Sequence, residues 1–190
     1  MRLIKGERLN LKITYPEDFN YFKLFVKPIH KSGIGYDIHQ IDTKSKKGLK
    51  LCGVKINFKK LIGHSDADVG LHAICDSIFG ALSMKDIGYY FSNKDPRWKN
   101  KNSEFFLKFA RDKLKENNFY IANLDVNFIC EKPNINKYRK KMISKLSLLL
   151  KIPEKIISIK ATSNEKIGFI GDGLGIAAES IIQITNDKLY

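Results

Sequence analysis

The fold is organised around one stretch of the chain, Gly63-His-Ser-Asp-Ala-Asp-Val-Gly-Leu-His-Ala-Ile-Cys-Asp76. Ser65 or Asp66 can act as the N-cap of a helix, because short polar side chains accept hydrogen bonds from the free N–H groups of a first turn. The pattern predicts a helix that runs to about Ser83. Its buried face is formed by apolar residues at helical spacing, namely Ala67, Leu71, Ile74, Ile78 and Leu82.

Three metal-type side chains share one face of this predicted helix. Asp68, His72 and Asp76 lie at positions i, i+4 and i+8, which places them in register. Metal ligation explains this spacing better than core packing does. For His72 taken alone, a hydrogen-bonded core histidine is an alternative interpretation. Asp68 and Asp76 are expected to support the metal ligands or to contact a substrate hydroxyl group.

A strand pattern supplies two further candidate ligands. Alternation in Gly33-Ile-Gly-Tyr-Asp-Ile-His-Gln-Ile41 places Asp37 and His39 on the same side of a strand. With His72 they form a set of two imidazoles and one carboxylate. Three protein ligands leave a fourth tetrahedral position open, which is typical of a catalytic zinc ion. The alternative is a structural role for both residues, as a strand-end carboxylate and a capped imidazole.

The length and composition predict one domain that does not enter a membrane. The chain has 190 residues, enough for a real core, and we expect a basic N-terminal extension over residues 1–31 followed by a domain over residues 32–190. No apolar run reaches the length of about 18 residues that a membrane helix needs. The mixed, charged N-terminus does not resemble a signal peptide. Widely spaced Cys52, Cys75 and Cys130 indicate reduced thiols.

The strong positive charge favours anionic partners. Lys and Arg number 34 against 20 Asp and Glu, a formal net charge of +14. The basic residues are scattered, and no aromatic and basic RNA-binding motif is present. We therefore expect a solvated basic surface and no nucleic-acid partner.

The remaining patterns predict an α+β fold with a single sheet and helices packed on one face. A hairpin is expected over 49–58 around Gly53, and a loop with aromatic residues over 85–99 is typical of a segment that covers a ligand. Ser103 is expected to cap the first of two further helices. The other predicted elements are helices over 103–117 and 136–151 and strands over 124–130, 156–161 and 176–185.

Two polar clusters indicate phosphate chemistry. His64 and Ser65 precede a helix N-terminus, where N–H groups and the helix dipole favour phosphate oxygens. Thr162 and Ser163 follow a strand and could hold a diphosphate, and Glu165 could hold Mg²⁺ or Mn²⁺. For Thr162 and Ser163 alone, an ordinary polar turn is the alternative.

At these residues the sequence is similar to the 2-C-methyl-D-erythritol 2,4-cyclodiphosphate synthase family. The matching motifs occur in the family's order from Ser32 to about Thr185. They are Gly33-Ile-Gly-Tyr-Asp-Ile-His, Gly63-His-Ser-Asp-Ala-Asp-Val, Leu71-His-Ala, Gly80-Ala, Asp86-Ile-Gly, Asp95-Pro, Lys160-Ala-Thr and Glu165-Lys-Ile-Gly-Phe169.

The resemblance implies a phosphorus–oxygen lyase of non-mevalonate isoprenoid biosynthesis. The expected reaction is the metal-dependent cyclisation of 4-CDP-2-C-methyl-D-erythritol 2-phosphate to 2-C-methyl-D-erythritol 2,4-cyclodiphosphate, with release of CMP. The expected assembly is a homotrimer with a central cavity and with active sites at the subunit interfaces.

The resemblance also implies the roles of individual residues. Asp37, His39 and His72 match the ligands of one Zn²⁺ per subunit, Glu165 matches the ligand of a second cation, Mg²⁺ or Mn²⁺, and His64 and Ser163 are the expected catalytic residues. The expected substrate-binding residues are Asp37, His39, His64, Ser65, Asp76, Asp86, Ile87, Gly88, Phe91, Asp95, Cys130, Glu131, Lys132, Pro133, Asn134, Ile135, Asn136, Thr162, Ser163, Asn164, Glu165 and Phe169.

The chain departs from the family pattern at several positions. Asn134 replaces a lysine on the nucleotide side, and Ser163 replaces a threonine. Ser92-Asn93-Lys94 replaces Pro-Asp-Thr in the covering loop. Asp172 stands where an arginine often faces the central cavity, which puts binding of an isoprenoid diphosphate there in doubt.

Two other functions are compatible with the residues alone. A zinc-dependent phosphohydrolase would release inorganic phosphate, and a basic zinc module would bind RNA in a salt-sensitive way without releasing CMP.

The basic N-terminal extension indicates a protein of a plastid, either an apicoplast or a chloroplast. The alternative compartment is the bacterial cytoplasm.

Overall fold

The computed structural model of the protein describes residues 6, 12–23 and 27–187. Much of the predicted extension, residues 1–5, 7–11 and 24–26, lies outside the described residues, as do residues 188–190. Within the extension, helix α1 spans Pro16–Lys23, and the Asp18 carboxylate accepts hydrogen bonds from the backbone N–H groups of Thr14 and Tyr15. The first strand begins at His30, slightly earlier than the pattern predicted.

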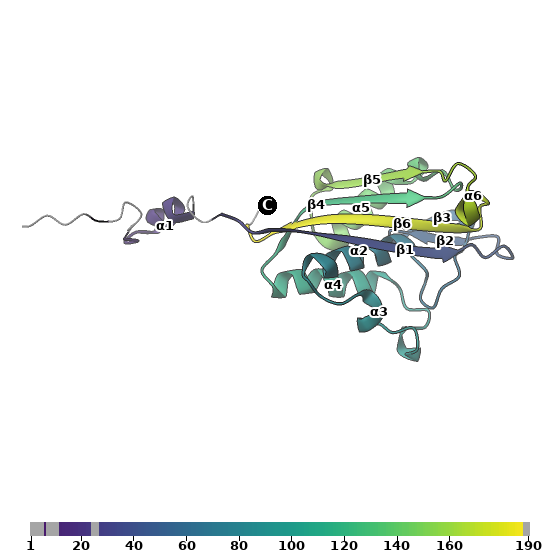
Figure 1. Ribbon diagram of the computed structural model, residues 1–190, viewed down its shortest axis with the longest axis horizontal. Helices are drawn as coiled ribbons and strands as arrows, with labels where there is room; N and C mark the ends of the chain where they lie inside the picture. The colour runs from purple at the N-terminus through teal and green to yellow at the C-terminus, as the bar shows by residue number, and fades with distance from the viewer. Residues whose placement is uncertain (1–5, 7–11, 24–26, 188–190) are drawn as a thin grey trace, which may run out of the picture.

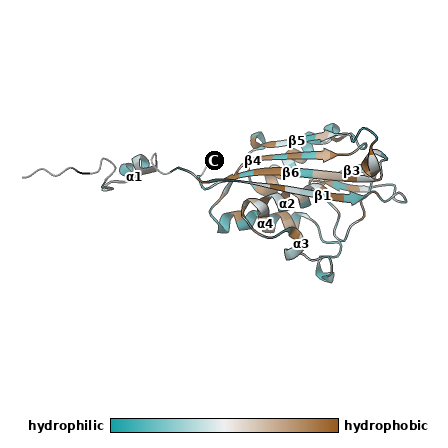
Figure 2. Ribbon diagram, viewed as in Figure 1, coloured by the Kyte–Doolittle hydropathy of each residue, from teal (hydrophilic) through white to brown (hydrophobic). Residues whose placement is uncertain are grey.

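A mixed four-stranded sheet forms the body of the protein, with the strand order β1-β6-β4-β5 (Figure 1). β6 runs antiparallel to both β1 and β4, whereas β4 and β5 are parallel. Figure 2 shows the apolar stretches of β4 and β6 in the centre of this sheet. The strands are β1 (His30–Gln40), β4 (Tyr120–Ile129), β5 (Ile157–Thr162) and β6 (Gly175–Thr185).

Three helices pack on one face of the sheet, and the predicted α+β fold is confirmed. They are α2 (Val69–Ala81), α4 (Glu104–Glu116) and α5 (Arg139–Leu150). On that face β4 and β6 present buried side chains at alternate positions, including Leu124, Val126, Phe128, Ile182 and Ile184. Four residues of β1 lie on the same face, namely Gly33, Gly35, Asp37 and His39. Their partners on β6, in the same order, are Ile182, Ser180, Ala178 and Ile176.

Two glycines of β1 allow α2 to lie directly on the strand. A Cβ atom at Gly35 would meet the carbonyl oxygen of Ala73 at 2.0 Å, and one at Gly33 would meet that of Ser77 at 2.0 Å. Real Cβ atoms do not approach so closely, so the absence of side chains sets the distance between helix and strand. This close contact brings His72 of α2 to the end of β1 that carries Asp37 and His39.

A separate hairpin lies beside the main sheet, as the sequence predicted. It pairs β2 (Gly48–Leu51) with β3 (Val54–Lys59). The two turn residues, Cys52 and Gly53, both have positive φ, 49° and 76°, which is the backbone of a type I′ turn. The Cys52 side chain is completely buried.

Helix α2 begins later than predicted, because Asp68 is its N-cap. The Asp68 carboxylate accepts hydrogen bonds from the N–H groups of Leu71, at 3.1 Å, Cys52, at 2.8 Å, and Gly53, at 2.7 Å. The prediction of Ser65 or Asp66 as the cap was wrong. Asp68 is fully buried, and burial raises its pKa. It therefore joins the helix to the hairpin turn and does not share a helix face with His72.

The loop over residues 85–99 is folded onto α4 through aromatic side chains. It contains the short helix α3 (Ile87–Tyr90) and the 3-10 turn η1 (Pro96–Trp98). The ring of Phe91 lies 4.5 Å from that of Phe106, and Trp98 stacks on Phe105 at 5.8 Å. Three further short elements are η2 (Ile135–Lys137), η3 (Glu154–Ile156) and α6 (Gly168–Gly171). Every helix in the described part of the chain is too short or too polar to cross a membrane.

Candidate active site

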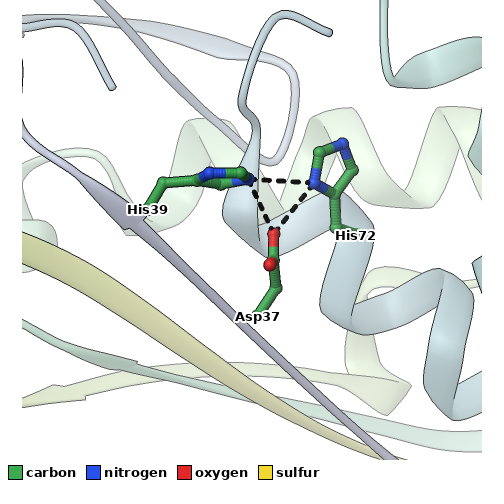
Figure 3. Close-up of side chains that lie close together, drawn as sticks. All are labelled: Asp37, His39 and His72. Atoms are coloured by element: carbon green, nitrogen blue, oxygen red, sulfur yellow. Dashed lines mark hydrogen bonds and ion pairs between the residues drawn. The ribbon is translucent and has the colours of Figure 1, made fainter. Parts of the chain in front are cut away.

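Asp37 and His39 of β1 and His72 of α2 converge on one point (Figure 3). Asp37 Oδ2 lies 2.8 Å from His72 Nδ1 and 3.1 Å from His39 Nε2, and the two imidazole nitrogens are 3.4 Å apart. Ligand atoms arranged tetrahedrally at about 2.1 Å from a zinc ion lie roughly 3.4 Å from one another. The geometry and the chemistry of the three donors therefore fit a single metal ion.

The charge on Asp37 is stabilised by the two histidines. Burial raises the pKa of Asp37, but hydrogen bonds with His39 and His72 outweigh this effect and bring the pKa well below its usual range. Burial likewise lowers the pKa of His72, yet the hydrogen bond to Asp37 raises it above the ordinary value. A proton between His72 and Asp37 thus competes with a metal ion.

This competition predicts a pH-dependent metal affinity. Because the pKa of His72 is raised, the imidazole becomes protonated at a higher pH than an ordinary histidine does. The affinity for Zn²⁺ is therefore expected to fall as the pH drops through the pKa of His72. Below it the fall should be roughly tenfold per pH unit. Competition for Zn²⁺ with a chromophoric chelator, at a series of pH values between about pH 8.5 and pH 5.5, measures the affinity. An affinity that stays constant down to about pH 6.5 would contradict the raised pKa.

Asp37, His39 and His72 line a cavity of about 380 Å³. His64 and Ser65 line it on the side of the turn before α2, and Ser65 Oγ lies 3.2 Å from His72 Nε2. His64 Nε2 lies 3.3 Å from the carbonyl oxygen of Asp95, so the loop over residues 85–99 contacts the cavity wall. Of the other predicted residues, Ile87, Gly88 and Phe91 also line this cavity.

The residues expected on the nucleotide side line a second cavity, of about 570 Å³. Its walls are formed by residues 130–136 together with Thr162 and Ser163, all predicted, and by Phe58 and Ala161, which were not. The Ser163 hydroxyl donates a hydrogen bond to Glu165, and the backbone N–H of Asn164 donates one to Glu131 at 2.9 Å. Among the residues that the structure describes, the two cavities have no lining residue in common.

Several predicted substrate residues line neither of these two cavities. Asp76 accepts a hydrogen bond from the N–H of Ile87 at 2.7 Å, and Asp86 accepts one from Tyr89 at 2.9 Å, so both shape the start of α3. Asp95 caps η1 and pairs with Arg97. The other three, Asn164, Glu165 and Phe169, lie on the turn after β5 and on α6.

Four residues at the first cavity were not expected there. Asn93, Trp98 and Phe106 line it, and Ser103 hydrogen-bonds to His72 from behind. The cluster of aromatic residues in the loop was the available signal for Trp98, whereas Phe106 was predicted only as part of an apolar helix stripe. Ser103 is the N-cap residue of α4, as predicted, but its hydroxyl makes no cap hydrogen bond to the helix.

The sequence matches the profile of the YgbB family over residues 30–185. The chain belongs to the YgbB family. It is 44% identical over 161 residues to the 2-C-methyl-D-erythritol 2,4-cyclodiphosphate synthase of Ehrlichia canis, covering 82% of this chain and 93% of that protein. It is also 46% identical over 185 residues to the bifunctional enzyme IspD/IspF of Bartonella henselae, covering 94% of this chain. It spans 46% of that enzyme, about half the length of the bifunctional relatives.

Solved structures agree with this assignment. IspF of Plasmodium falciparum, determined as a CDP complex, superposes with a TM-score of 0.73 at 39% identity, covering 84% of this chain and 97% of that one. The bifunctional IspDF of Campylobacter jejuni gives a TM-score of 0.80 at 34% identity, covering 96% of this chain and 49% of that one. The family resemblance predicted from the motifs is confirmed.

Proposed function

We propose that the protein cyclises 4-CDP-2-C-methyl-D-erythritol 2-phosphate to 2-C-methyl-D-erythritol 2,4-cyclodiphosphate with release of CMP. The observation that carries the proposal is the convergence of Asp37, His39 and His72 at a cavity, in a chain that belongs to the YgbB family. The name of the Ehrlichia canis relative supports the same reaction, which is a step of non-mevalonate isoprenoid biosynthesis.

Two metal sites are part of the proposal. Asp37, His39 and His72 would hold one Zn²⁺ per subunit, since two imidazoles, a carboxylate and an open fourth position suit zinc. Glu165, next to the Ser163 hydroxyl, would hold Mg²⁺ or Mn²⁺ together with substrate phosphate oxygens. When bound, these cations polarise phosphoryl oxygens and neutralise the charge that develops on the departing nucleotide.

The protein's main contribution to the reaction is positioning. An oxygen of the substrate's own 2-phosphate, already anionic at neutral pH, bonds to the β-phosphorus, and the bond from that phosphorus to the bridging oxygen breaks. CMP then leaves with the bridging oxygen, so no strong general base is required. Holding two reacting groups in line can remove roughly 7–11 kcal/mol from a barrier. His64 and Ser163 donate hydrogen bonds to the phosphates in this proposal.

We infer that the active enzyme is a homotrimer with interfacial sites. In one subunit the zinc-type ligands and the Thr162–Ser163 pair belong to different cavities, so a neighbouring copy is needed to bring them together. The outer face of the sheet supports association, because Ile34 and Ile181 are cross-strand partners and are 69% and 50% exposed. Light scattering should give three times the chain mass of 21.8 kDa. The expected central cavity, with Asp172 in place of arginine, belongs to the same proposal.

The wider context of the protein follows from its relatives. The curated relatives named above are bacterial, which favours a bacterial cytoplasm and does not support the plastid prediction. The chain spans about half of the bifunctional relatives, so the second activity in their names is not assigned to it. Neither nucleic acid nor membrane is part of the proposal.

Phosphorus NMR of the purified protein with the CDP-linked substrate and Mg²⁺ tests the reaction. We expect signals of the cyclic diphosphate and CMP to appear together, and their formation to stop when zinc is removed by a chelator and to return when zinc is added. Inorganic phosphate as the product would instead identify a zinc-dependent phosphohydrolase. No product of either kind, with the zinc-loaded protein and intact substrate, would overturn both assignments.

A further inference from the structure

The ring nitrogen of His72 that faces away from Asp37 and His39 lies against a buried serine. His72 Nε2 is 2.8 Å from the hydroxyl oxygen of Ser103, while Nδ1 on the opposite side of the ring faces Asp37 and His39. The Ser103 side chain is fully buried at the start of α4. A histidine that binds a metal through one nitrogen is commonly oriented by a hydrogen bond at the other.

The direction of this hydrogen bond follows from the neighbours of Ser103. The Ser103 hydroxyl lies within hydrogen-bond distance of Asp66 Oδ1, which also accepts the Ser103 backbone N–H at 3.1 Å. The other oxygen of Asp66 forms an ion pair with the Lys50 ammonium group at 2.8 Å. An ionised carboxylate only accepts, so the serine proton goes to Asp66 and the serine oxygen accepts from His72 Nε2–H.

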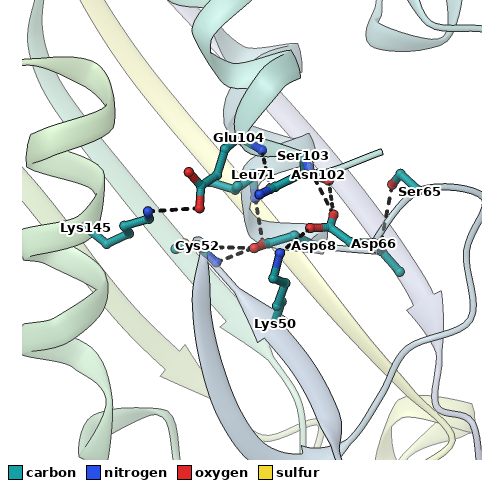
Figure 4. Close-up of polar contacts among 12 residues, drawn as sticks. Lys50, Cys52, Ser65, Asp66, Asp68, Leu71, Asn102, Ser103, Glu104 and Lys145 are labelled. Atoms are coloured by element: carbon teal, nitrogen blue, oxygen red, sulfur yellow. Dashed lines mark hydrogen bonds and ion pairs between the residues drawn. The ribbon is translucent and has the colours of Figure 1, made fainter. Parts of the chain in front are cut away.

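We infer that Asp66 and Ser103 are positioning residues that keep the proton of His72 on Nε2 and direct the lone pair of Nδ1 at the metal. The inference rests on the metal site of the proposed function. The chain of contacts runs from Lys50 through Asp66 and Ser103 to His72, and Figure 4 shows the contacts of its first three members. It joins the β2–β3 hairpin, the turn before α2 and the start of α4 to the ligand.

Ser65 is the other hydroxyl near this nitrogen, and the structure distinguishes it from Ser103. Its oxygen lies farther from His72 Nε2, at 3.2 Å, and it accepts a hydrogen bond from the N–H of Ala67 at 3.3 Å. Ser65 also lines the cavity, where a ligand can displace its contacts. The buried Ser103, held by two hydrogen bonds to Asp66, is the closer contact of His72 Nε2 and is not among the residues that line the cavity.

Metal affinity, measured without any substrate, tests the inference. Zn²⁺ is titrated into the metal-free protein in competition with a chromophoric chelator. Ser103→Ala and Asp66→Asn are expected to lower the affinity roughly 10–100-fold, the usual effect of losing the partner of a ligating histidine. Ser103→Thr retains a hydroxyl and should restore most of the affinity. Ser77→Ala is the matched control, because Ser77 is another buried, hydrogen-bonded serine that contacts Ile74 and Ser180 and not His72.

Proton NMR of the zinc-loaded protein gives a readout that a purely structural role would not change. The Nε2–H proton of His72 should be protected from exchange in the wild type and in Ser77→Ala, and should be lost to solvent exchange in Ser103→Ala. If Ser103→Ala does not fold, Asp66→Asn carries the test. Folded Ser103→Ala or Asp66→Asn protein that binds Zn²⁺ within about twofold of the wild type overturns the inference. A wild-type protein that binds no zinc contradicts the proposed function instead.

Discussion

Replacing His72 by alanine is expected to abolish CMP release while leaving a folded protein of unchanged oligomeric mass. Two of the three converging ligands, Asp37 and His39, come from one strand, and His72 is the contribution of α2. Without it the site offers two ligands, and several kcal/mol of charge stabilisation is lost, which corresponds to a decrease of about a thousandfold or more in rate. An assay of CMP release measures the activity, circular dichroism measures the folding, and light scattering measures the oligomeric mass.

His30→Ala is the matched control for that experiment. His30 is also on β1, but it lies at the opposite end of the strand and is exposed. The control should retain full activity and bind one Zn²⁺ per subunit. Full activity of His72→Ala would refute the zinc assignment, whereas an unfolded His72→Ala protein would show that the residue is needed for the fold itself.

Replacing Gly35 by alanine is expected to destabilise the protein by about 3 kcal/mol or more, at the upper end of the usual range for overpacking. The new Cβ atom would lie 2.0 Å from the carbonyl oxygen of Ala73 and 2.7 Å from the backbone nitrogen of Ser77. Both are backbone atoms of α2, so no side-chain rotation relieves the clash, and the helix must move away from β1. Urea denaturation at a fixed protein concentration measures the change in the free energy of unfolding.

The same substitution should also weaken metal binding, because α2 carries His72 and β1 carries Asp37 and His39. Gly80→Ala is the matched control at the same helix–strand contact. Its Cβ atom would meet its nearest neighbour, the carbonyl oxygen of Ile34, at 3.6 Å, an ordinary van der Waals distance. Since alanine favours a helix more than glycine does, by about 1 kcal/mol, Gly80→Ala should be neutral or stabilising. Equal stability of Gly35→Ala and the wild type would show that α2 does not need the close contact.

Local patterns in the sequence were sufficient wherever short-range geometry decides the structure. Alternation along β1 placed Asp37 and His39 on one side of a strand, and the structure confirms this. Gly53 indicated the hairpin turn, because the turn requires positive φ. The helices and strands were found with errors at their ends, and β4 begins four residues before the predicted position 124, at Tyr120.

The choice among neighbouring polar residues could not be made from local patterns. Ser65, Asp66 and Asp68 are all suitable N-caps, and the donors that decide between them, the N–H groups of Cys52 and Gly53, come from a hairpin earlier in the chain. Ser103 likewise has the sequence position of a cap, but its hydroxyl is engaged by Asp66 and His72. Long-range hydrogen bonds therefore decided which residue caps α2, and at α4 they decided what the hydroxyl of the correctly predicted N-cap residue binds.

The sequence by itself determined the family, the α+β class and the three side chains that converge, since these depend on residue types and on periodicities of two and 3.6 residues. Only the tertiary structure decided that Asp68 ties the hairpin to α2, that Asp66 and Ser103 lie behind His72, and that predicted site residues are divided between two cavities of the chain. These features depend on contacts between segments far apart in the chain, which no local pattern encodes.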